Sequence, residues 1–216
     1  MLDDANVLNQ RDPGGALQIA ADQWQQVQFD VAVLDGENVR GEITKVVVAG
    51  MGGSALAALL TKAWLEEKLP IPFEVVREYE LPTYVDQSTL VVASSYSGNT
   101  EETLASLDQA IERGAQVGVL AAGGKLVERA EADHLARVVI PSGMQPRMAM
   151  LFNLRALVLL LSQFGVVEKA LLDEVGEAAE WLRDESRAWL PDVPTDKNPA
   201  KQLALQAVGK TPVFYG

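Results

Sequence analysis

The sequence predicts an α/β fold in which a five-stranded parallel sheet is sandwiched between helices, with a helical extension toward the C-terminus. Three observations predict it. Five short runs are largely apolar, as strands buried on both faces are. Amphipathic segments with helical spacing lie between and after them. Hydrophobic residues make up 48% of the 216 residues and charged residues 22%, a composition typical of a packed globular chain.

The predicted strands are recognised by β-branched and aliphatic residues bounded by turn residues. The first is rich in valine and leads into a glycine-rich loop, and the last ends at Pro141. Runs this short and this apolar fit the strands of a parallel sheet. The strands that we predict cover residues 45–49, 73–76, 89–94, 117–121 and 137–140.

Helices are predicted where apolar residues recur at helical spacing. The segment that follows Pro146 is strongly apolar, and the next one is acidic and amphipathic. The last begins with Asn198 as N-cap and Pro199 at the first helical position, two residue types that suit those places. The predicted helices cover residues 53–66, 100–113, 126–130, 147–164, 167–190 and 198–209.

The segment Thr211–Gly216 (TPVFYG) predicts one more strand, because it combines β-forming residues with a final glycine, as the first strand does. Two interpretations are open. The segment begins a second α/β unit, or it adds an edge strand to the one sheet.

Charge and composition disfavour several classes of function. With 18 Lys and Arg against 30 Asp and Glu the net charge is −12, whereas nucleic acids and anionic membranes attract basic surfaces. The sequence has no cysteine and one histidine, so thiolate nucleophiles, cysteine zinc sites and multi-histidine metal sites are not expected. Neither a targeting segment nor a membrane-spanning one is visible, and we expect a soluble cytoplasmic protein.

The first candidate site is the glycine-rich loop 50–54 (GMGGS), between the first strand and its helix. Glycines let a ligand approach the backbone, and helix N-termini offer free N–H groups to an anion. Gly50, Gly52 and Ala55 also fit the dinucleotide pattern G-x-G-x-x-A, although no acidic residue stands where the ribose would bind. A tight turn without a ligand is the alternative.

The second candidate site is the run 94–103 (SSYSGNTEET), at the end of the third strand. The hydroxyls of Ser95, Ser97 and Thr100, together with N–H groups at a helix start, can hold a phosphate without lysine. The alternative is an ordinary helix start with a capping box at Asn99. Because the carboxyl ends of parallel strands meet at one edge of a sheet, the two loops together favour a phosphate site.

The third candidate site is the segment 141–147 (PSGMQPR), after the fifth strand. Pro146 suits the first turn of a helix, which places Arg147 at a helix start. A cation is unfavourable there unless an anion lies nearby, so its position indicates function. The alternative is a surface arginine paired with Glu101 or Glu102.

In this order, the runs GMGGS, SYSGNTEET and PSGMQPR resemble those of the bifunctional phosphoglucose/phosphomannose isomerases, which belong to the sugar isomerase (SIS) domain superfamily. The similarity extends along essentially the whole chain and includes 198–201 and 212–216. It implies a Rossmann-like, three-layer SIS-type fold. It also implies an N-terminal, sugar-phosphate-binding SIS domain at 1–165, followed at 166–216 by a helical linker and the truncated start of a second SIS domain.

The resemblance implies an aldose–ketose isomerase that converts glucose 6-phosphate and mannose 6-phosphate to fructose 6-phosphate through a cis-enediol, without a metal or an organic cofactor. It implies that Arg147 supports the charge that develops on the enediol. We also expect a homodimer, because the helices after Pro146 offer apolar surface to a partner. The residues expected to bind the phosphate are Gly52, Gly53, Ser54, Ser95, Ser97 and Thr100.

One departure from the family bears on activity. The resemblance implies a catalytic glutamate, a ring-opening histidine and a further lysine in a second domain, and all three would lie beyond Gly216. His134 matches no motif of the family and is interpreted as a surface or hinge residue. We therefore expect the chain to bind sugar phosphate without full turnover. Two other functions stay open: a non-catalytic SIS module that senses a phosphosugar, and a Rossmann oxidoreductase.

Overall fold

The computed structural model describes residues 2–38 and 41–213. By its internal contacts the chain divides into two units, the larger formed by residues 26–176 and the smaller by 1–25 with 177–216. The larger unit contains the sheet, and the smaller one is helical. The domain limits predicted from the sequence, 1–165 and 166–216, stay a prediction.

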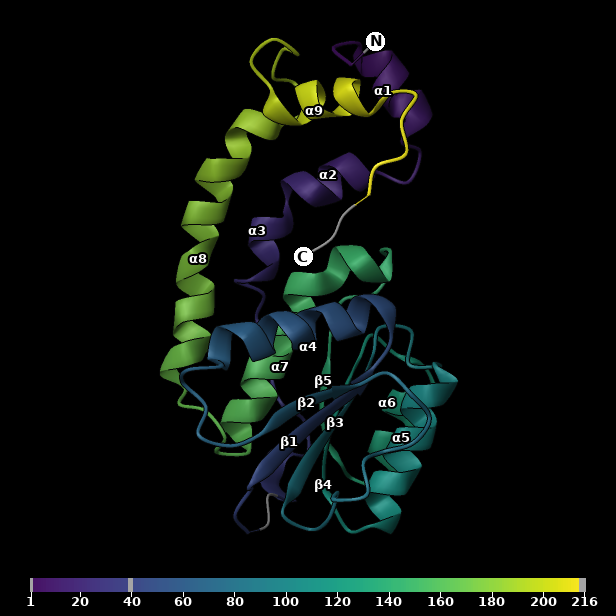
Figure 1. Cartoon of the computed structure of the whole chain (residues 1–216), viewed down its shortest axis with the longest axis vertical. Helices are drawn as coiled ribbons and strands as arrows, with labels where there is room; N and C mark the ends of the chain where they lie inside the picture. Colours follow the sequence, from purple (N-terminus) through teal and green to yellow (C-terminus); the bar gives the residue numbers. More distant parts are fainter. Residues whose placement is uncertain (1, 39–40, 214–216) are drawn as a thin grey trace. The chain divides into compact units, whose positions relative to one another are not determined.

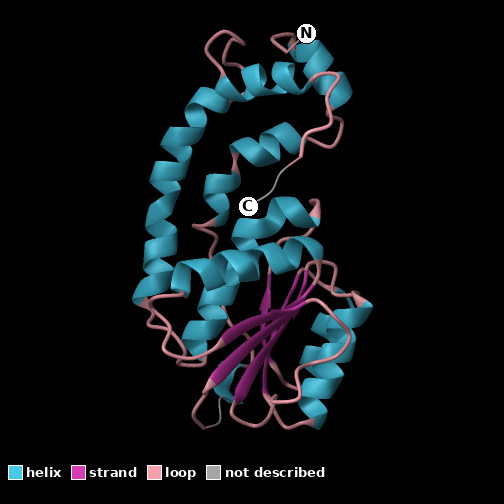
Figure 2. Ribbon diagram, viewed as in Figure 1, coloured by secondary structure: helices cyan, strands magenta, loops and turns pink. Residues whose placement is uncertain are grey.

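A five-stranded sheet forms the centre of the larger unit (Figures 1 and 2). The strand order is β2-β1-β3-β4-β5, and each neighbouring pair is parallel, which confirms the predicted fold class. Each predicted strand is present, with ends that differ by one residue at most. The strands are β1 (Lys45–Gly50), β2 (Phe73–Val76), β3 (Thr89–Ser95), β4 (Gln116–Ala121) and β5 (Ala136–Val139).

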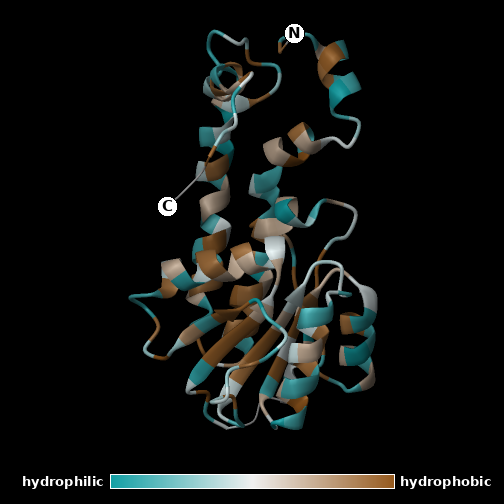
Figure 3. Cartoon of the chain, turned by 45° about the vertical axis from the view of Figure 1, so that its right-hand side comes forward, coloured by the Kyte–Doolittle hydropathy of each residue, from teal (hydrophilic) through white to brown (hydrophobic). Residues whose placement is uncertain are grey.

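Helices cover both faces of this sheet, because successive strand residues enter two different apolar cores. On β1, Val46 and Val48 pack in one core with residues of two helices, α4 (Gly52–Leu65) and α7 (Met150–Gln163). Val47 and Ala49 pack in the other core with residues of α5 (Glu101–Glu112) and α6 (Gly124–Ala132). The central strands β1 and β3 are hydrophobic over most of their length (Figure 3).

Short helices precede the sheet, and the sequence analysis did not predict them. The first two bury no side chain, so they lack the apolar periodicity from which helices are predicted. One signal was present: Asp4 is the N-cap of the first, and its carboxylate accepts hydrogen bonds from the N–H groups of Asn6 and Val7. These elements are α1 (Ala5–Arg11), α2 (Ala16–Ala21), α3 (Gln23–Gln26) and the 3₁₀ turn η1 (Gly36–Asn38).

The C-terminal helices correct several predicted limits. The apolar helix begins as a 3₁₀ turn, η2 (Pro146–Ala149), and continues as α7. The helix predicted at 167–190 is shorter, because α8 (Ala170–Ser186) gives way to the 3₁₀ turn η3 (Arg187–Trp189). The last helix, α9 (Pro199–Ala207), begins as predicted, with the Asn198 side chain accepting from the N–H of Lys201.

The strand predicted at 211–216 does not form in the part that the structure describes. Residues 211–213 have no regular secondary structure, and residues 214–216 lie outside the described residues. Neither interpretation of this segment gains support from it.

A buried lysine organises the smaller unit. The ammonium group of Lys201, with a side chain only 10% exposed, donates to the carboxylate of Asp3 at 2.8 Å. It also donates to the carbonyl oxygens of Pro191 at 2.7 Å and Val193 at 2.8 Å. The three donor positions of the ammonium group are thereby used, and the N-terminal segment is joined to the loop before α9.

Within the described residues, no helix combines the length and the apolar character that a membrane crossing requires.

Candidate functional site

The candidate site lies at the carboxyl edge of the sheet, between β1 and β3. From these adjacent strands the chain leads to opposite faces, to α4 on one and α5 on the other. Ligands of open α/β sheets bind at this switch point. A cavity of about 430 Å³ is present there, and it is lined by each of the predicted site residues: Gly52, Gly53, Ser54, Ser95, Ser97, Thr100 and Arg147.

Two glycines allow close backbone contacts at this edge of the sheet. A Cβ atom on Gly53 would lie 2.8 Å from the backbone nitrogen of Arg147 and 2.8 Å from the carbonyl carbon of Pro146. A Cβ atom on Gly50 would lie 2.7 Å from the carbonyl oxygen of Ser94. Gly53 therefore lets the start of α4 lie against the backbone before Arg147, and Gly50 lets the paired ends of β1 and β3 lie close together. Residues with a side chain at these positions would separate them.

Three hydroxyl groups gather in the loop after β3. The hydroxyls of Ser95 and Thr100 share a hydrogen bond 2.7 Å long, and the hydroxyls of Ser95 and Ser97 are 3.5 Å apart. The N–H of Gly98 donates to Ser95 Oγ at 3.2 Å, and that of Asn99 donates to Ser97 Oγ at 3.3 Å. Each hydroxyl has one hydrogen to donate and two lone pairs, so the cluster can turn its donors toward an anion.

Ser54 links this loop to the glycine-rich loop. It is buried, and its Oγ accepts a hydrogen bond of 3.0 Å from the N–H of Tyr96. The hydroxyl hydrogen of Ser54 is therefore free of that bond and can be donated to a ligand in the cavity.

The start of α5 corrects the capping-box alternative. Its N-cap is Thr100, whose side chain makes no capping hydrogen bond. The Asn99 carboxamide instead accepts from the N–H of Lys125 at 3.2 Å and donates to the Ser97 carbonyl at 3.1 Å. The N-cap of α4, Met51, also makes no side-chain capping bond. Two helix N-termini thus present uncapped N–H groups to the cavity, where they favour an anion.

The loop after β4 supports the hydroxyl cluster, and the sequence analysis missed it. Gly98 has φ +69°, and a Cβ atom there would lie only 1.8 Å from the carbonyl oxygen of Gly123. Gly124 has φ +71°, and a Cβ atom there would lie 2.4 Å from the Ser97 carbonyl oxygen. The Gly-Gly pair that follows the fourth predicted strand was the signal that could have revealed this close packing.

Arg147 lies on η2, and its side chain is exposed. Within the described part of the chain its guanidinium forms no ion pair, so the alternative of a pair with Glu101 or Glu102 is wrong. Glu101 instead accepts a hydrogen bond of 3.4 Å from the hydroxyl of Tyr79. The negative charge of Glu102, with partial burial and the charge of Glu101, raises the pKa of Tyr79.

The chemistry of the cavity follows from these groups. The cavity offers hydroxyls, backbone N–H groups and one guanidinium, which are donors that suit a dianionic phosphate ester. The described lining has no carboxylate that would repel such a ligand. None of the described residues that line the cavity is Asp, Glu or His, the residue types that most often serve as a general base. The described residues also contain no group of three or more His, Asp or Glu side chains placed to hold a metal ion.

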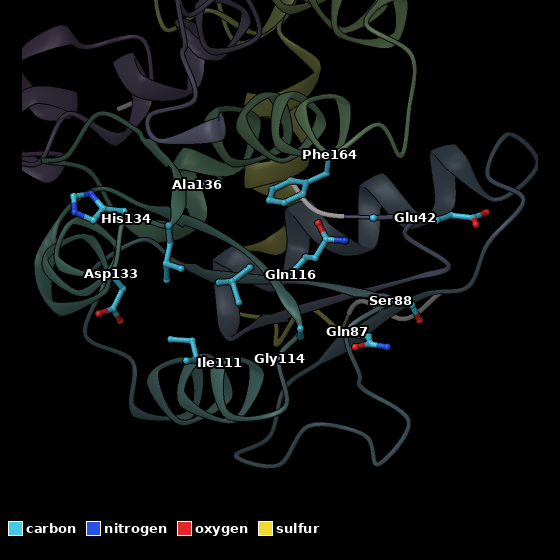
Figure 4. A pocket seen from close by; sticks show the side chains of 14 residues that line it. Glu42, Gln87, Ser88, Ile111, Gly114, Gln116, Asp133, His134, Ala136 and Phe164 are labelled. Carbon is cyan, nitrogen blue, oxygen red and sulfur yellow. The ribbon is translucent and has the colours of Figure 1, made fainter. Parts of the chain in front are cut away.

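Figure 4 shows a second cavity, of about 740 Å³, at the amino edge of the sheet, where β4 begins at Gln116. His134 lies at its wall and is exposed, which confirms the interpretation of a surface histidine. The described lining includes Glu42 and Asp133 but neither lysine nor arginine. The larger cavity is therefore a poor site for an anion.

The chain has a doubly wound parallel sheet with uncapped helix starts at its switch point, and α/β proteins of this class commonly bind phosphate-bearing ligands at that edge. A family model described as the SIS domain matches residues 42–165, which is more than half of the chain. The chain belongs to the SIS domain family.

Curated relatives share sequence with most of this chain. A bifunctional phosphoglucose/phosphomannose isomerase from Caldicellulosiruptor bescii is 44% identical over 195 residues, which cover 89% of this chain and 57% of the relative. A D-glucosamine-6-phosphate 4-epimerase from Sulfolobus acidocaldarius is 31% identical over 195 residues, with 90% of this chain and 58% of the relative covered. The chain thus spans little more than half the length of either relative.

The fold also matches solved structures. The C-terminal domain of glucosamine-fructose-6-phosphate aminotransferase from Francisella tularensis superposes with a TM-score of 0.57 at 16% identity, over 82% of this chain and 53% of that one. At this level of identity the match establishes the similarity of fold.

Proposed function

We propose that this chain binds the phosphate of a hexose 6-phosphate in the cavity between the loops after β1, β3 and β5. It does so as part of an isomerase that interconverts glucose 6-phosphate or mannose 6-phosphate with fructose 6-phosphate. The observation that carries the proposal is the hydroxyl cluster of Ser95, Ser97 and Thr100 beside uncapped helix starts and Arg147, whose guanidinium has no ion pair within the described residues. The names of the two sequence relatives support it, since both act on phosphosugars although their reactions differ.

In this proposal, binding of the phosphate orients the reacting end of the sugar. Hydroxyl and N–H donors bind it far from C1 and C2, and this remote binding orients the chain of carbon atoms. Arg147, on the opposite loop of the same cavity, supplies a positive charge for the enediolate that forms when a proton leaves C2. Positive charge aimed at that position stabilises the transition state more than the ground state.

The proton transfer between C2 and C1 needs a base, and the described lining of the cavity contains no Asp, Glu or His. We propose that residues outside this lining provide it, and that the 216-residue chain by itself binds the phosphosugar without full turnover. A non-catalytic phosphosugar sensor would share the binding step and differ only in having no such base.

Isothermal titration calorimetry with fructose 6-phosphate, and with fructose as the ligand without phosphate, tests the binding step. The chain is expected to bind the ester and not the free sugar. The double variant Ser95→Ala/Thr100→Val should lose at least about tenfold in affinity, because each lost donor to a charged group is worth about 1.5–3 kcal/mol. Ser142→Ala is the matched control, since Ser142 is exposed, lies in the third loop and is not part of the described lining.

Equal affinity of the double variant and the parent would refute the hydroxyl cluster as the phosphate site. A coupled isomerase assay on the same chain should show no conversion of glucose 6-phosphate, and measurable turnover would refute the proposed lack of a base. Tight binding of a dinucleotide without binding of sugar phosphate would favour an oxidoreductase instead.

A further inference from the structure

Tyr96 joins the three loops of the site through its backbone N–H and its hydroxyl. Its side chain is buried, with 7% of the residue exposed. Its hydroxyl donates to the Pro141 carbonyl at 3.0 Å and accepts from the N–H of Met144 at 3.1 Å. A single phenol thereby bridges the two ends of the turn that leads to Arg147, using both its donor and an acceptor position.

Gln26, the last residue of α3, holds the backbone on the other side of Arg147. Its carboxamide is buried, with 3% of the residue exposed. Its Nε2 donates to the carbonyl of Met148 at 2.8 Å, and its Oε1 accepts from the N–H of Phe152 at 3.2 Å. The Gln26 side chain therefore fixes the end of η2 and the first turn of α7 at the same time.

The guanidinium of Arg147 has no ion-pair partner of its own within the described chain. Its place at the cavity is therefore set by its backbone, which Gly53 contacts closely and which the hydrogen bonds of Tyr96 and Gln26 flank. A buried, fully hydrogen-bonded polar side chain holds its partners in one arrangement, because breaking these bonds leaves buried polar groups unpaired.

We propose that Tyr96 and Gln26 are positioning residues: together they fix the segment 141–152 so that the guanidinium of Arg147 faces the cavity. The inference rests on the proposed function for the ligand that Arg147 serves. The arrangement itself is a property of the chain without ligand, and it can be tested as such.

Hydrogen exchange of the ligand-free chain, measured by NMR, tests the arrangement. Tyr96→Phe removes one oxygen atom and should accelerate exchange of the Met144 N–H by about tenfold or more, since that N–H loses its only described acceptor. Exchange at Val47, in the centre of the sheet, should stay unchanged and shows that the fold is intact. Unchanged exchange at Met144 would overturn the proposal, whatever the chain binds.

Gln26→Leu should likewise accelerate exchange of the Phe152 N–H, whose acceptor it removes. Two matched controls exist. Tyr79→Phe removes the hydroxyl of an exposed tyrosine that contacts Glu101, and Gln163→Leu removes an exposed carboxamide that donates to Gly36. Neither control should change exchange at Phe152 or at Met144.

A pair of ligands measures the effect on Arg147. The five-carbon compound arabinonate 5-phosphate carries a carboxylate at the place of the enediolate oxygens, and arabinitol 5-phosphate has a neutral alcohol there. The ratio of their affinities for the chain reports on Arg147. Arg147→Ala should remove the preference for the carboxylate, and Tyr96→Phe should reduce it by about tenfold, the effect expected when one charge-assisted contact is misplaced.

The double-mutant cycle separates positioning from general weakening. In the Arg147→Ala background, Tyr96→Phe should cause no further loss of the preference, because the group that it positions is gone. An equal loss in both backgrounds, or a preference unchanged in the single Tyr96→Phe variant, would overturn the proposal. If the parent chain binds neither ligand while exchange at Met144 responds as expected, the proposed function fails and the backbone arrangement stands.

Discussion

Because Gly53 has no Cβ atom, the start of α4 and the backbone before Arg147 can lie close together. The backbone of Pro146 and Arg147 occupies the space where a Cβ atom would lie. Gly176, on α8, offers a comparison, because the nearest atom to its absent Cβ is Arg155 Nη1 at 3.5 Å, an ordinary contact. Both residues lie in helices, so the same substitution at the two positions differs chiefly in what it meets.

Gly53→Ala is expected to lower the free energy of unfolding by about 1–3 kcal/mol, the usual cost of overpacking, and to weaken phosphosugar binding. Gly176→Ala should raise it by about 0.5–1 kcal/mol, because alanine loses less backbone entropy than glycine in a helix. Urea unfolding of both variants checks the signs. Equal stabilisation by the two substitutions would show that position 53 tolerates a side chain.

The candidate site was predictable from the sequence where its residues carry a local signal. Ser95, Ser97 and Thr100 stand together in one run after a buried strand, and that pattern sufficed to place them in one site. Tyr96 carries no such signal, because its hydroxyl bonds backbone groups 45 and 48 residues away, at Pro141 and Met144. Because residues of nearly every type carry the same backbone groups, a backbone partner cannot be recognised from the sequence.

Among the elements, the strands were predicted well and the helix ends less so. A strand buried on both faces, such as β3 (Thr89–Ser95), is apolar over most of its length, and its position is therefore visible in the sequence. An exposed helix obeys no such requirement. The predicted helix 167–190 runs too far because its acidic face continues to be compatible with a helix, whereas the chain changes to a 3₁₀ turn at Arg187. The helices before β1 are too short to show a period.

Asp3 and Lys201 make one contact between elements sensitive to pH. Hydrogen bonds from the Lys201 ammonium and from the hydroxyl and N–H of Thr195 hold the pKa of Asp3 at about 2, below its usual value of 3.8. Because the pKa is lower in the folded chain, the contact contributes fully at pH values above the usual pKa of 3.8 and is lost as the pH falls through about 2.

The carboxyl carbon of Asp3, followed by NMR from pH 5 downward, should titrate near 2, and exchange of the Thr195 N–H should accelerate over the same range. Lys201→Met should shift the titration of Asp3 back toward 3.8. A carboxyl carbon that titrates near 3.8 in the unaltered chain would contradict the contact.

At the scale of the whole molecule, the position of the site follows from strand order. Because β1 and β3 are neighbours while their helices cover opposite faces, the two loops open on a common space. The sequence predicted parallel strands, and hence a shared edge, but parallel strands can be ordered in several ways. Which strands are adjacent depends on packing between distant segments, and local pattern does not encode it.

The central claim is that a phosphate ester binds between the loops after β1 and β3. Titration of the ¹⁵N-labelled chain with fructose 6-phosphate, followed by ¹⁵N–¹H NMR, tests it most directly. The account predicts that the N–H signals of Gly53, Ser97 and Glu101 shift with the ester and stay in place with fructose. Shifts confined to the second cavity, near Gln116 and His134, or no shift with either compound, would contradict it.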